Sequence, residues 1–191
     1  MVRWGLAAAF STAFVVAAVA IFAVASIGAH ALGVTLLPLH WRLALAGAGL
    51  VLLAAADLRA LSRSSYCPIG WRRQTPRVLL RRYHMFVVAT LWGFDTGLVV
   101  TTFRVAAVSW AALYIAALGL APGWTGLAYG LGFTSPFLVL LFRPNLGVAA
   151  KSPTPTDPGL ERMLRMRSLA QACSAALLIA SGGLLIGTLI D

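Results

Sequence analysis

The chain has 191 residues, of which 60% are apolar and only 10% charged, and its mean hydropathy is +0.89. A soluble domain carries roughly 25% charged residues, so this composition excludes a soluble globule and indicates a polytopic membrane protein. The net charge of +10 comes from fourteen arginines and one lysine against five acids. These basic residues lie in loops beside apolar segments, which is typical of the positive-inside rule. We therefore expect contact with the lipid bilayer and none with nucleic acid.

A membrane-spanning helix needs about 20 consecutive apolar residues. Four segments meet this requirement: 4–28, 41–61, 123–142 and 168–190. The first also resembles a signal peptide, but its apolar run exceeds the roughly 7–15 residues of a signal h-region. We therefore expect it to remain as an uncleaved anchor. A fifth apolar segment, 83–120, has 38 residues, which is too long for one straight span and barely enough for two.

The basic residues distinguish five spans from six. If 83–120 crosses once, loops 62–82 and 143–167 both face the cytoplasm, and thirteen of the fifteen basic residues lie inside or at the inner boundary. Six spans would need a tight turn at Phe103-Arg104 and would move five basic residues outside. Because loop arginines and lysines set orientation, five spans are favoured, with six as the alternative. This places the N-terminus in the cytoplasm of a multi-pass protein of the plasma (inner) membrane.

A single crossing by 38 residues implies a broken helix. Irregular backbone survives inside a membrane only where protein or water covers it, as at transport sites. The expected weak point is 92–97, which contains two glycines and an aspartate able to cap freed amides. The predicted fold is one all-α transmembrane domain over 1–191, with five helices, the third of them broken.

Asp95 is the central candidate for a functional residue. It lies about 18 Å from the inner boundary of its segment, near the membrane centre, where an acid is by default a functional-site hypothesis. The alternatives are that Asp95 caps the broken helix or pairs with Arg104. If the site is functional, we expect it to be lined by four hydroxyl side chains, with Arg104 as counter-ion or anion contact: Thr96, Thr101, Thr102 and Thr134.

Other polar and small residues have simpler structural interpretations. Thr134-Ser135-Pro136 predicts a kinked helix whose hydroxyls bond carbonyls that the proline leaves free. Asp57 is expected to pair locally with Arg59. The sequences Gly126-x-x-x-Gly130 and Gly183-x-x-x-Gly187 predict close helix packing. The two cysteines, 67 and 173, are expected to be a surface thiol and a small core residue rather than a redox pair.

The second half of the chain resembles a known membrane family. The stretch 127–138, LAYGLGFTSPFL, is similar to the A-Y-x-L-G-x-x-x-P-F-L helix of the CcdA/DsbD thiol-electron transporters, within the LysE-type transporter superfamily. The resemblance covers about 83–190 and implies a fold of inverted three-helix repeats. The first broken helix of that family has no counterpart here.

The resemblance does not carry the family's redox chemistry with it. The family places a cysteine followed by a proline in each broken helix, whereas the corresponding stretch here, 93–100, contains neither. Its first four residues, Gly93-Phe94-Asp95-Thr96, look like the G-F-D-T signature of nickel/cobalt permeases, a sister branch. The histidine- and aspartate-rich helix of those permeases is also missing.

These observations favour a small transporter or transporter subunit, rather than an enzyme, with its site around Asp95 and a metal ion or small solute as substrate. Five helices enclose little volume, so we expect a homo-oligomer or a partner membrane subunit. Two alternatives stay open: a CcdA-like helper in thiol or cytochrome maturation without redox activity of its own, and a purely structural membrane subunit.

Overall fold

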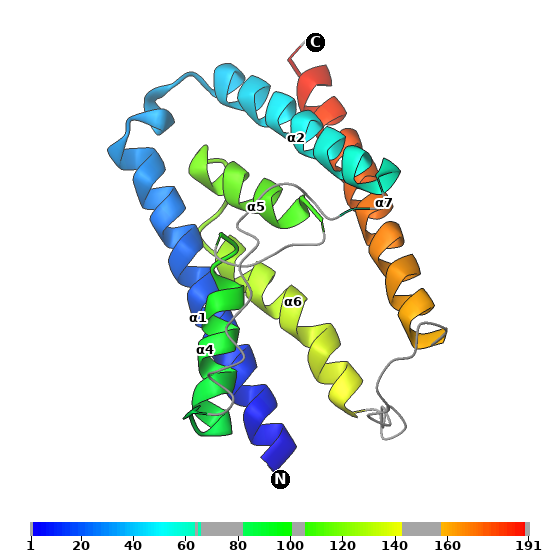
Figure 1. Ribbon diagram of the computed structural model, residues 1–191. Coiled ribbons are helices and arrows are strands. Elements are labelled where there is room, and N and C mark those ends of the chain that lie inside the picture. Colours follow the sequence, from blue (N-terminus) through cyan, green and yellow to red (C-terminus); the bar gives the residue numbers. More distant parts are fainter. Residues whose placement is uncertain (1, 64, 66–81, 101–105, 143–157, 190–191) are drawn as a thin grey trace.

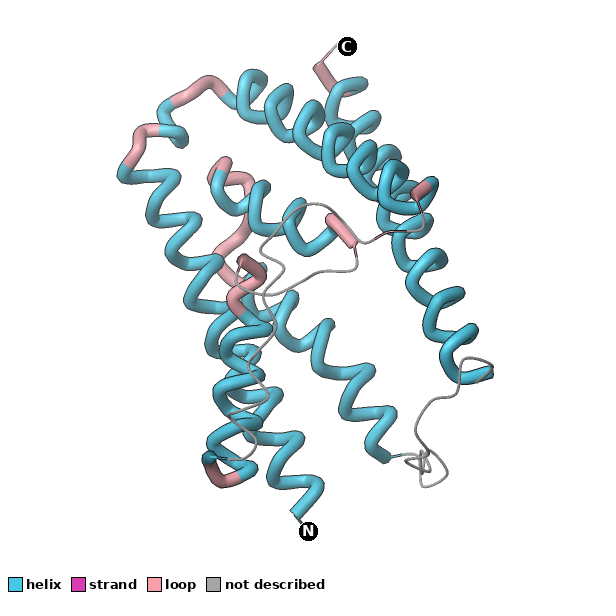
Figure 2. Tube along the Cα trace, in the orientation of Figure 1, coloured by secondary structure: helices cyan, strands magenta, loops and turns pink. Residues whose placement is uncertain are grey.

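A computed structural model describes residues 2–63, 65, 82–100, 106–142 and 158–189 of the chain. Throughout these ranges the regular structure is helical (Figures 1 and 2). Three helices are long and apolar enough to cross a membrane: Trp4–Ala31, Leu39–Ser62 and Met166–Gly187. The predicted class, an all-helical membrane protein, is therefore supported.

The first two helices match the predicted spans and are longer than expected. Helix α1 is Val2–Ala31 and helix α2 is Leu39–Ser62. The connection turns at Gly33, whose φ of 70° is the left-handed conformation that glycine adopts without strain. A short 3-10 helix, η1 (Val34–Leu36), and Pro38 then lead into α2.

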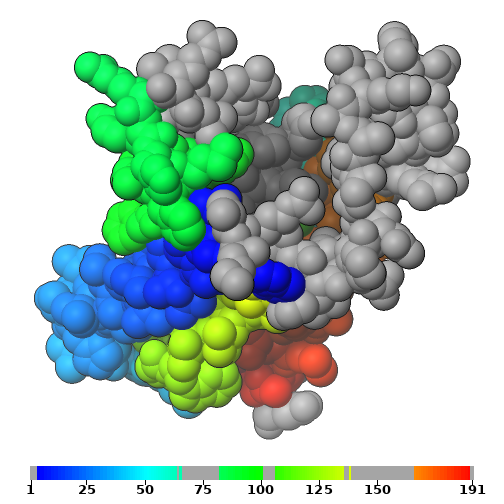
Figure 3. All heavy atoms as spheres, turned by 90° about the horizontal axis from the view of Figure 1, so that it is seen from below, coloured from blue at the N-terminus to red at the C-terminus, as the bar shows by residue number. Residues whose placement is uncertain are grey.

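Helix α1 is the centre of one packing group. Helix α4, Met85–Gly97, runs parallel to it, because Gly93 meets the backbone of Phe10 and Gly97 meets the backbone of Phe14. Helix α6, Thr125–Phe142, runs antiparallel on another face of α1, with Gly126 against Val19 and Gly130 against Val15. Figure 3 shows α1 between these two helices.

Helices α2 and α7 form the second packing group. Helix α7 is Pro158–Gly187, so residues 158–167, which were predicted to belong to the loop 143–167, are the first ten residues of this helix. It packs antiparallel on α2, with Gly47 facing Gly182. A Cβ on either of these glycines would lie 3.1–3.2 Å from the carbonyl oxygen of the other.

The segment 83–120 is broken, as predicted, but the break comes after the expected weak point. Helix α4 continues through 92–97 and ends at Gly97, and helix α5 begins at Val108 and ends at Ala117. Val99 follows α4 with φ of 59°, an unusual conformation for a β-branched residue, and its side chain is fully buried beside Phe22 and Ala116. Close packing of glycines on α1 explains why α4 does not break earlier.

Helix α5 joins the two packing groups. It has ten residues, about 15 Å of helix, which is roughly half the hydrocarbon thickness of a bilayer. It contacts α1, α2 and α7 and lies in the middle of the molecule (Figure 1). Leu50, Ala54, Ala107, Ala111 and Leu178 form the buried apolar cluster that α5 shares with α2 and α7.

Candidate functional site: a short helix held at both ends

The N-terminus of α5 meets a buried carboxylate from α2. Asp57 is 0% exposed, and both of its oxygens accept from the backbone N–H of Ala107, at 2.9 and 3.0 Å. The Ser174 hydroxyl, on α7, donates to Asp57 Oδ2 at 2.6 Å. A negative group at a helix N-terminus interacts favourably with the helix dipole and satisfies an amide that has no partner inside the helix.

The C-terminus of α5 meets a guanidinium from the same helix α2. Arg42 Nε donates to the carbonyl of Leu118 at 2.9 Å, and its Nη2 donates to the carbonyl of Gly119. These carbonyls belong to the turn that ends α5, where a cation is favourable. Asp57 and Arg42 therefore complement the two ends of the α5 dipole, and we call this pair of contacts the α5 clamp.

A third contact aligns the middle of α5 with α2. The Tyr114 hydroxyl donates to the carbonyl of Leu45 at 2.9 Å. The tyrosine ring lies against Gly49, where a Cβ would be 2.2 Å from Tyr114 Cε1. On its other side α5 is linked to α6, since the Tyr129 hydroxyl lies 3.1 Å from Ser109 Oγ. The short helix is thus fixed by polar contacts along its whole length.

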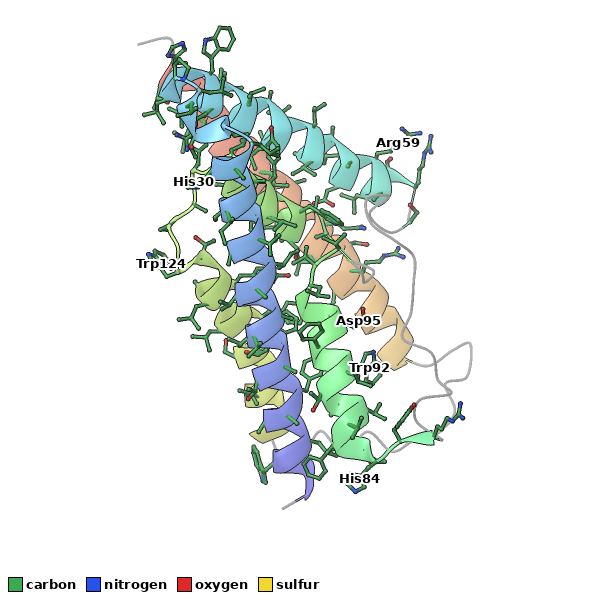
Figure 4. The ribbon with its side chains drawn as sticks, turned by 90° about the vertical axis from the view of Figure 1, so that its left-hand side faces the viewer. His30, Arg59, His84, Trp92, Asp95 and Trp124 are labelled. Atoms are coloured by element: carbon green, nitrogen blue, oxygen red, sulfur yellow. The ribbon has the colours of Figure 1, made fainter. Side chains whose placement is uncertain are left out.

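The clamp replaces the predicted local pair between Asp57 and Arg59. Two residues along a helix are about 200° apart. Asp57 is buried, whereas Arg59, labelled in Figure 4, is exposed. The prediction was wrong because it considered only neighbours in sequence. The bonds that satisfy Asp57 come from residues 50 and 117 positions away.

Asp95 lies inside α4 rather than at the break. Gly93 and Gly97 face α1, and Asp95 is two residues from each, so its half-buried carboxylate is on the side of α4 turned away from α1. Figure 4 shows Trp92 and Asp95 on that side. At the N-terminus of α5, the residue that caps the amide of the N-cap Ala107 is Asp57.

The predicted hydroxyl residues are only partly brought together. Thr96 neighbours Asp95 on α4, and its hydroxyl donates to the carbonyl of Trp92 at 2.7 Å. Thr134 is buried on α6, and its hydroxyl donates to the carbonyl of Gly130 at 2.8 Å. In the described parts of the chain α4 and α6 pack on α1 without extensive contact with each other. Thr101, Thr102 and Arg104 lie outside the described residues, as does Cys67.

The hydroxyl that was predicted to compensate for the proline of α6 is in place. Pro136 has no N–H, so the carbonyl of Gly132, four residues earlier, loses its helical donor. The Ser135 hydroxyl lies 3.4 Å from that carbonyl oxygen and donates to it. The helix consequently continues to Phe142.

One of the two predicted Gly-x-x-x-Gly contacts is confirmed, and the predicted burial of Cys173 is not. Gly126-x-x-x-Gly130 packs on α1 as expected, with built Cβ positions 2.9–3.0 Å from α1 backbone atoms. Gly183-x-x-x-Gly187 does not, since no atom of the described residues lies within 4 Å of where a Cβ would be on either glycine, and Gly182 makes the contact with α2 instead. Cys173 is exposed on α7 and is not a core residue.

Sequence reasoning missed three features of the site. The pair Gly93-x-x-x-Gly97 brings α4 against the backbone of α1, and its spacing was visible in the sequence. Ser174 and the almost fully buried Gln171 were also missed. They are polar residues three positions apart in an apolar span, a spacing that puts both on one helix face. That spacing was the available signal for a partner of Asp57.

The site contains a buried carboxylate, a guanidinium and a helix that ends inside the bundle, which can together orient charge within a membrane. No three His, Cys, Asp or Glu side chains of the described ranges gather in a way that could hold a metal ion. Comparison with protein-family models, curated proteins and solved structures found no match to this chain.

Proposed function

We propose that this protein is a small membrane transporter, or one subunit of a transporter, in which the broken segment α4–α5 is the transport element. The observation that carries the proposal is α5, a ten-residue helix that ends inside the bundle. Discontinuous helices of this kind build the substrate and ion sites of secondary transporters, where half-helix ends supply fixed partial charges.

Within this proposal Asp95 contacts the transported ion or solute. It is an acid about ten residues into α4, roughly 15 Å from the start of that helix, and it is half-buried on the side away from α1. Thr96 belongs to the same turn, and Thr101, Thr102 and Arg104 belong to the segment that follows. Thr134 is left out of the site, because it lies on α6, and the described residues of α6 have no extensive contact with α4.

The proposed topology has five spans, with the N-terminus and the loops 62–82 and 143–167 in the cytoplasm. The parallel packing of α4 on α1 supports this arrangement, because a third span should run in the same direction as the first. The basic residues of the two loops support the orientation in the plasma membrane. A second copy or a partner subunit would complete the solute path.

A second candidate function is a purely structural membrane subunit. The α5 clamp favours it, since Asp57 and Arg42 bond the two ends of α5, and Asp57 also bonds Ser174 of α7. These contacts are all internal to the protein. On this hypothesis the break in 83–120 only lets α5 fill the space between the two packing groups. The two functions differ in whether Asp95 binds anything from solution.

The test is the thermal stability of the purified full-length protein in detergent, titrated with divalent metal ions, small thiols and small organic ions. A ligand that binds the native state raises the melting temperature as its concentration rises. The transporter proposal expects a rise with one ligand class that Asp95→Asn abolishes. Asp57→Asn is the control, because it weakens the clamp and lowers the melting temperature but leaves that rise in place.

The outcomes separate the two functions. If no ligand changes the melting temperature of the wild-type protein, and Asp95→Asn is itself strongly destabilised, Asp95 is an internal structural group and the transporter proposal fails. If a ligand effect is abolished by Asp57→Asn but kept in Asp95→Asn, the site lies at the α5 clamp and the assignment of Asp95 is wrong.

A further inference from the structure

The connection between α1 and α2, residues 32–38, turns its apolar side chains outward. It lies at the periphery of the molecule, at the upper left of Figure 1. Leu32 is 82% exposed and Leu36 is 87% exposed, more than any other large apolar side chain that the structure describes. Thr35, the one polar side chain of this segment, is partly buried, and its Cγ2 lies 2.7 Å from the position that a Cβ on Gly119 would take, just after α5. Exposed leucines grouped in this way mark a surface that contacts something other than water.

The backbone of this connection supplies many of its own hydrogen bonds. Four of its amides donate to carbonyls of the same segment or of the end of α1: those of Leu32, Gly33, Leu36 and Leu37. Pro38, the last residue before α2, has no amide hydrogen. These groups do not need water as a partner, so their transfer out of water costs little. The connection is therefore suited to apolar surroundings.

The membrane is next to this connection, because both helices that it joins are long and apolar enough to span a bilayer. The apolar part of α1, Trp4–Ala31, has 28 residues and is about 42 Å long. A bilayer is about 40–45 Å thick with its headgroup regions, around a hydrocarbon core of about 30 Å. An upright α1 centred in the bilayer therefore ends among the headgroups, and a tilted one ends deeper. No Asp, Glu, Lys or Arg occurs between Arg3 and Arg42 to hold the connection in water.

The exposed leucines continue the apolar faces of the two flanking helices. Ile27, near the end of α1, and Leu39, at the start of α2, are exposed as well. Trp41 is also exposed, and tryptophan is enriched at the level of the lipid headgroups. Arg42, the first cation of α2, donates to the carbonyl of Leu118, so its charge is used at the end of α5. The surface that meets lipid on α1 and α2 thus runs without interruption through the connection.

We propose that the α1–α2 connection is a lipid-binding surface, inserted into the interface of the adjacent leaflet, and that its depth there fixes the depth of the C-terminal end of α5. The leucines contact the upper part of the acyl chains, and no particular headgroup is selected, because the segment has no charged side chain. Thr35 and Arg42, within and after the connection, both contact the turn that ends α5. The inference goes beyond the proposed transport role and requires only that α1 and α2 span the membrane.

The experiment is electron paramagnetic resonance of the full-length protein in lipid nanodiscs, with one spin label at a time. The label is attached to a single introduced cysteine in a chain that also carries Cys67→Ser and Cys173→Ser. Its accessibility to oxygen, which is concentrated in hydrocarbon, is compared with its accessibility to a water-soluble nickel chelate. Leu36→Cys reports on the connection. The references are Leu52→Cys, exposed in the middle of α2, and Arg63→Cys, exposed just beyond its end.

The ratio of oxygen to nickel accessibility at Leu36→Cys is expected to be severalfold higher than at Arg63→Cys and to approach the ratio at Leu52→Cys. Because Leu36 is so exposed, its replacement leaves the packing of the helices intact. A ratio equal to that of Arg63→Cys would place the connection in water and overturn the proposal. Low accessibility to both reagents would show that protein covers the leucines, a second copy for example, and would overturn it as well.

The link to α5 is tested with a label at Gly123→Cys, where a Cβ meets no atom of the described residues within 4 Å. Leu36→Asp is added to this labelled chain, because a carboxylate is costly away from water and should draw the connection toward the aqueous phase. The oxygen-to-nickel ratio at Gly123→Cys is then expected to fall. An unchanged ratio, in a protein whose helical circular dichroism is preserved, overturns the link between the connection and α5.

Discussion

The contact between α1 and α4 leads to a quantitative prediction for Gly93→Ala. A Cβ at residue 93 would lie 2.2 Å from the carbonyl oxygen of Phe10, and real Cβ contacts are essentially never shorter than 3.0 Å. The two backbones must therefore separate by at least 0.8 Å, the difference between these distances. No side-chain rotation can relieve the contact, because the opposing atom is backbone.

The effect of this separation on the free energy of unfolding can be estimated. A radial gap of about 0.5–1 Å removes roughly a quarter to a half of each van der Waals attraction across an interface, and forced overpacking typically costs about 1–3 kcal/mol. This cost is offset by about 1 kcal/mol, because the helix propensity of alanine is higher than that of glycine. We therefore expect Gly93→Ala to lower the free energy of unfolding by about 0–2 kcal/mol, the difference between the overpacking cost and the propensity gain.

Gly97→Ala should behave similarly, because its Cβ would lie 2.4 Å from the carbonyl oxygen of Phe14. A single separation of the helices relieves both clashes. The double variant should therefore be less destabilised than the sum of the two single variants, as expected for residues that share one backbone shift.

The assay is reversible unfolding in mixed detergent micelles, followed by tryptophan fluorescence and circular dichroism. The matched control is Gly132→Ala on α6, where a Cβ would have no atom of the described residues within 4 Å. This variant should therefore gain stability from the higher helix propensity of alanine, without a clash. If Gly93→Ala is as stable as Gly132→Ala, α4 does not pack on α1 at the described distance, and the parallel arrangement is refuted.

Three further predictions concern the break, the clamp and the proline of α6. At Val99, where φ is 59°, Val99→Gly should be at least as stable as Val99→Ala in the same unfolding assay, because glycine adopts this conformation without strain. A clearly higher stability of Val99→Ala would contradict the positive φ. Arg42→Met keeps the apolar stem but removes the donors to two α5 carbonyls, so it should lower the free energy of unfolding by about 1–3 kcal/mol, and an unchanged value would show that the guanidinium does not hold α5. Ser135→Ala removes the donor to the carbonyl freed by Pro136 and should cost about 1 kcal/mol, whereas Thr12→Val, an exposed hydroxyl on α1, should cost less.

Three apolar helices long enough to cross a membrane, and the break, could be predicted because they depend on properties local to the chain. A run of apolar residues has to become helical in a membrane whatever its neighbours are, since the backbone must satisfy its own hydrogen bonds. The length of 83–120 likewise required an interruption. Its exact position could not be predicted, because Gly93 and Gly97 weaken an isolated helix but are held against the α1 backbone here.

The candidate site was predictable only in part. Asp95 and Thr96 stand out in the sequence because a charge in an apolar segment is rare, and they do lie together on α4. The clamp was not predictable, because Asp57 near the end of a span looks like an interfacial residue with a neighbouring arginine. Only the packing of α5 and α7 on α2 shows that this carboxylate faces inward.

By itself, the sequence determined that this protein is all-helical and belongs in a membrane, that an apolar segment of the chain must be interrupted, and that Ser135 compensates for Pro136. These properties follow from apolar length and from covalent geometry, which act over a few neighbouring residues. The tertiary structure alone decided which glycines carry helix contacts, which way Asp95 faces, and that Asp57 and Arg42 hold the two ends of α5. The physical reason is that a buried polar group takes its stability from its partners, and for Asp57 those partners are 50 and 117 residues away in the chain.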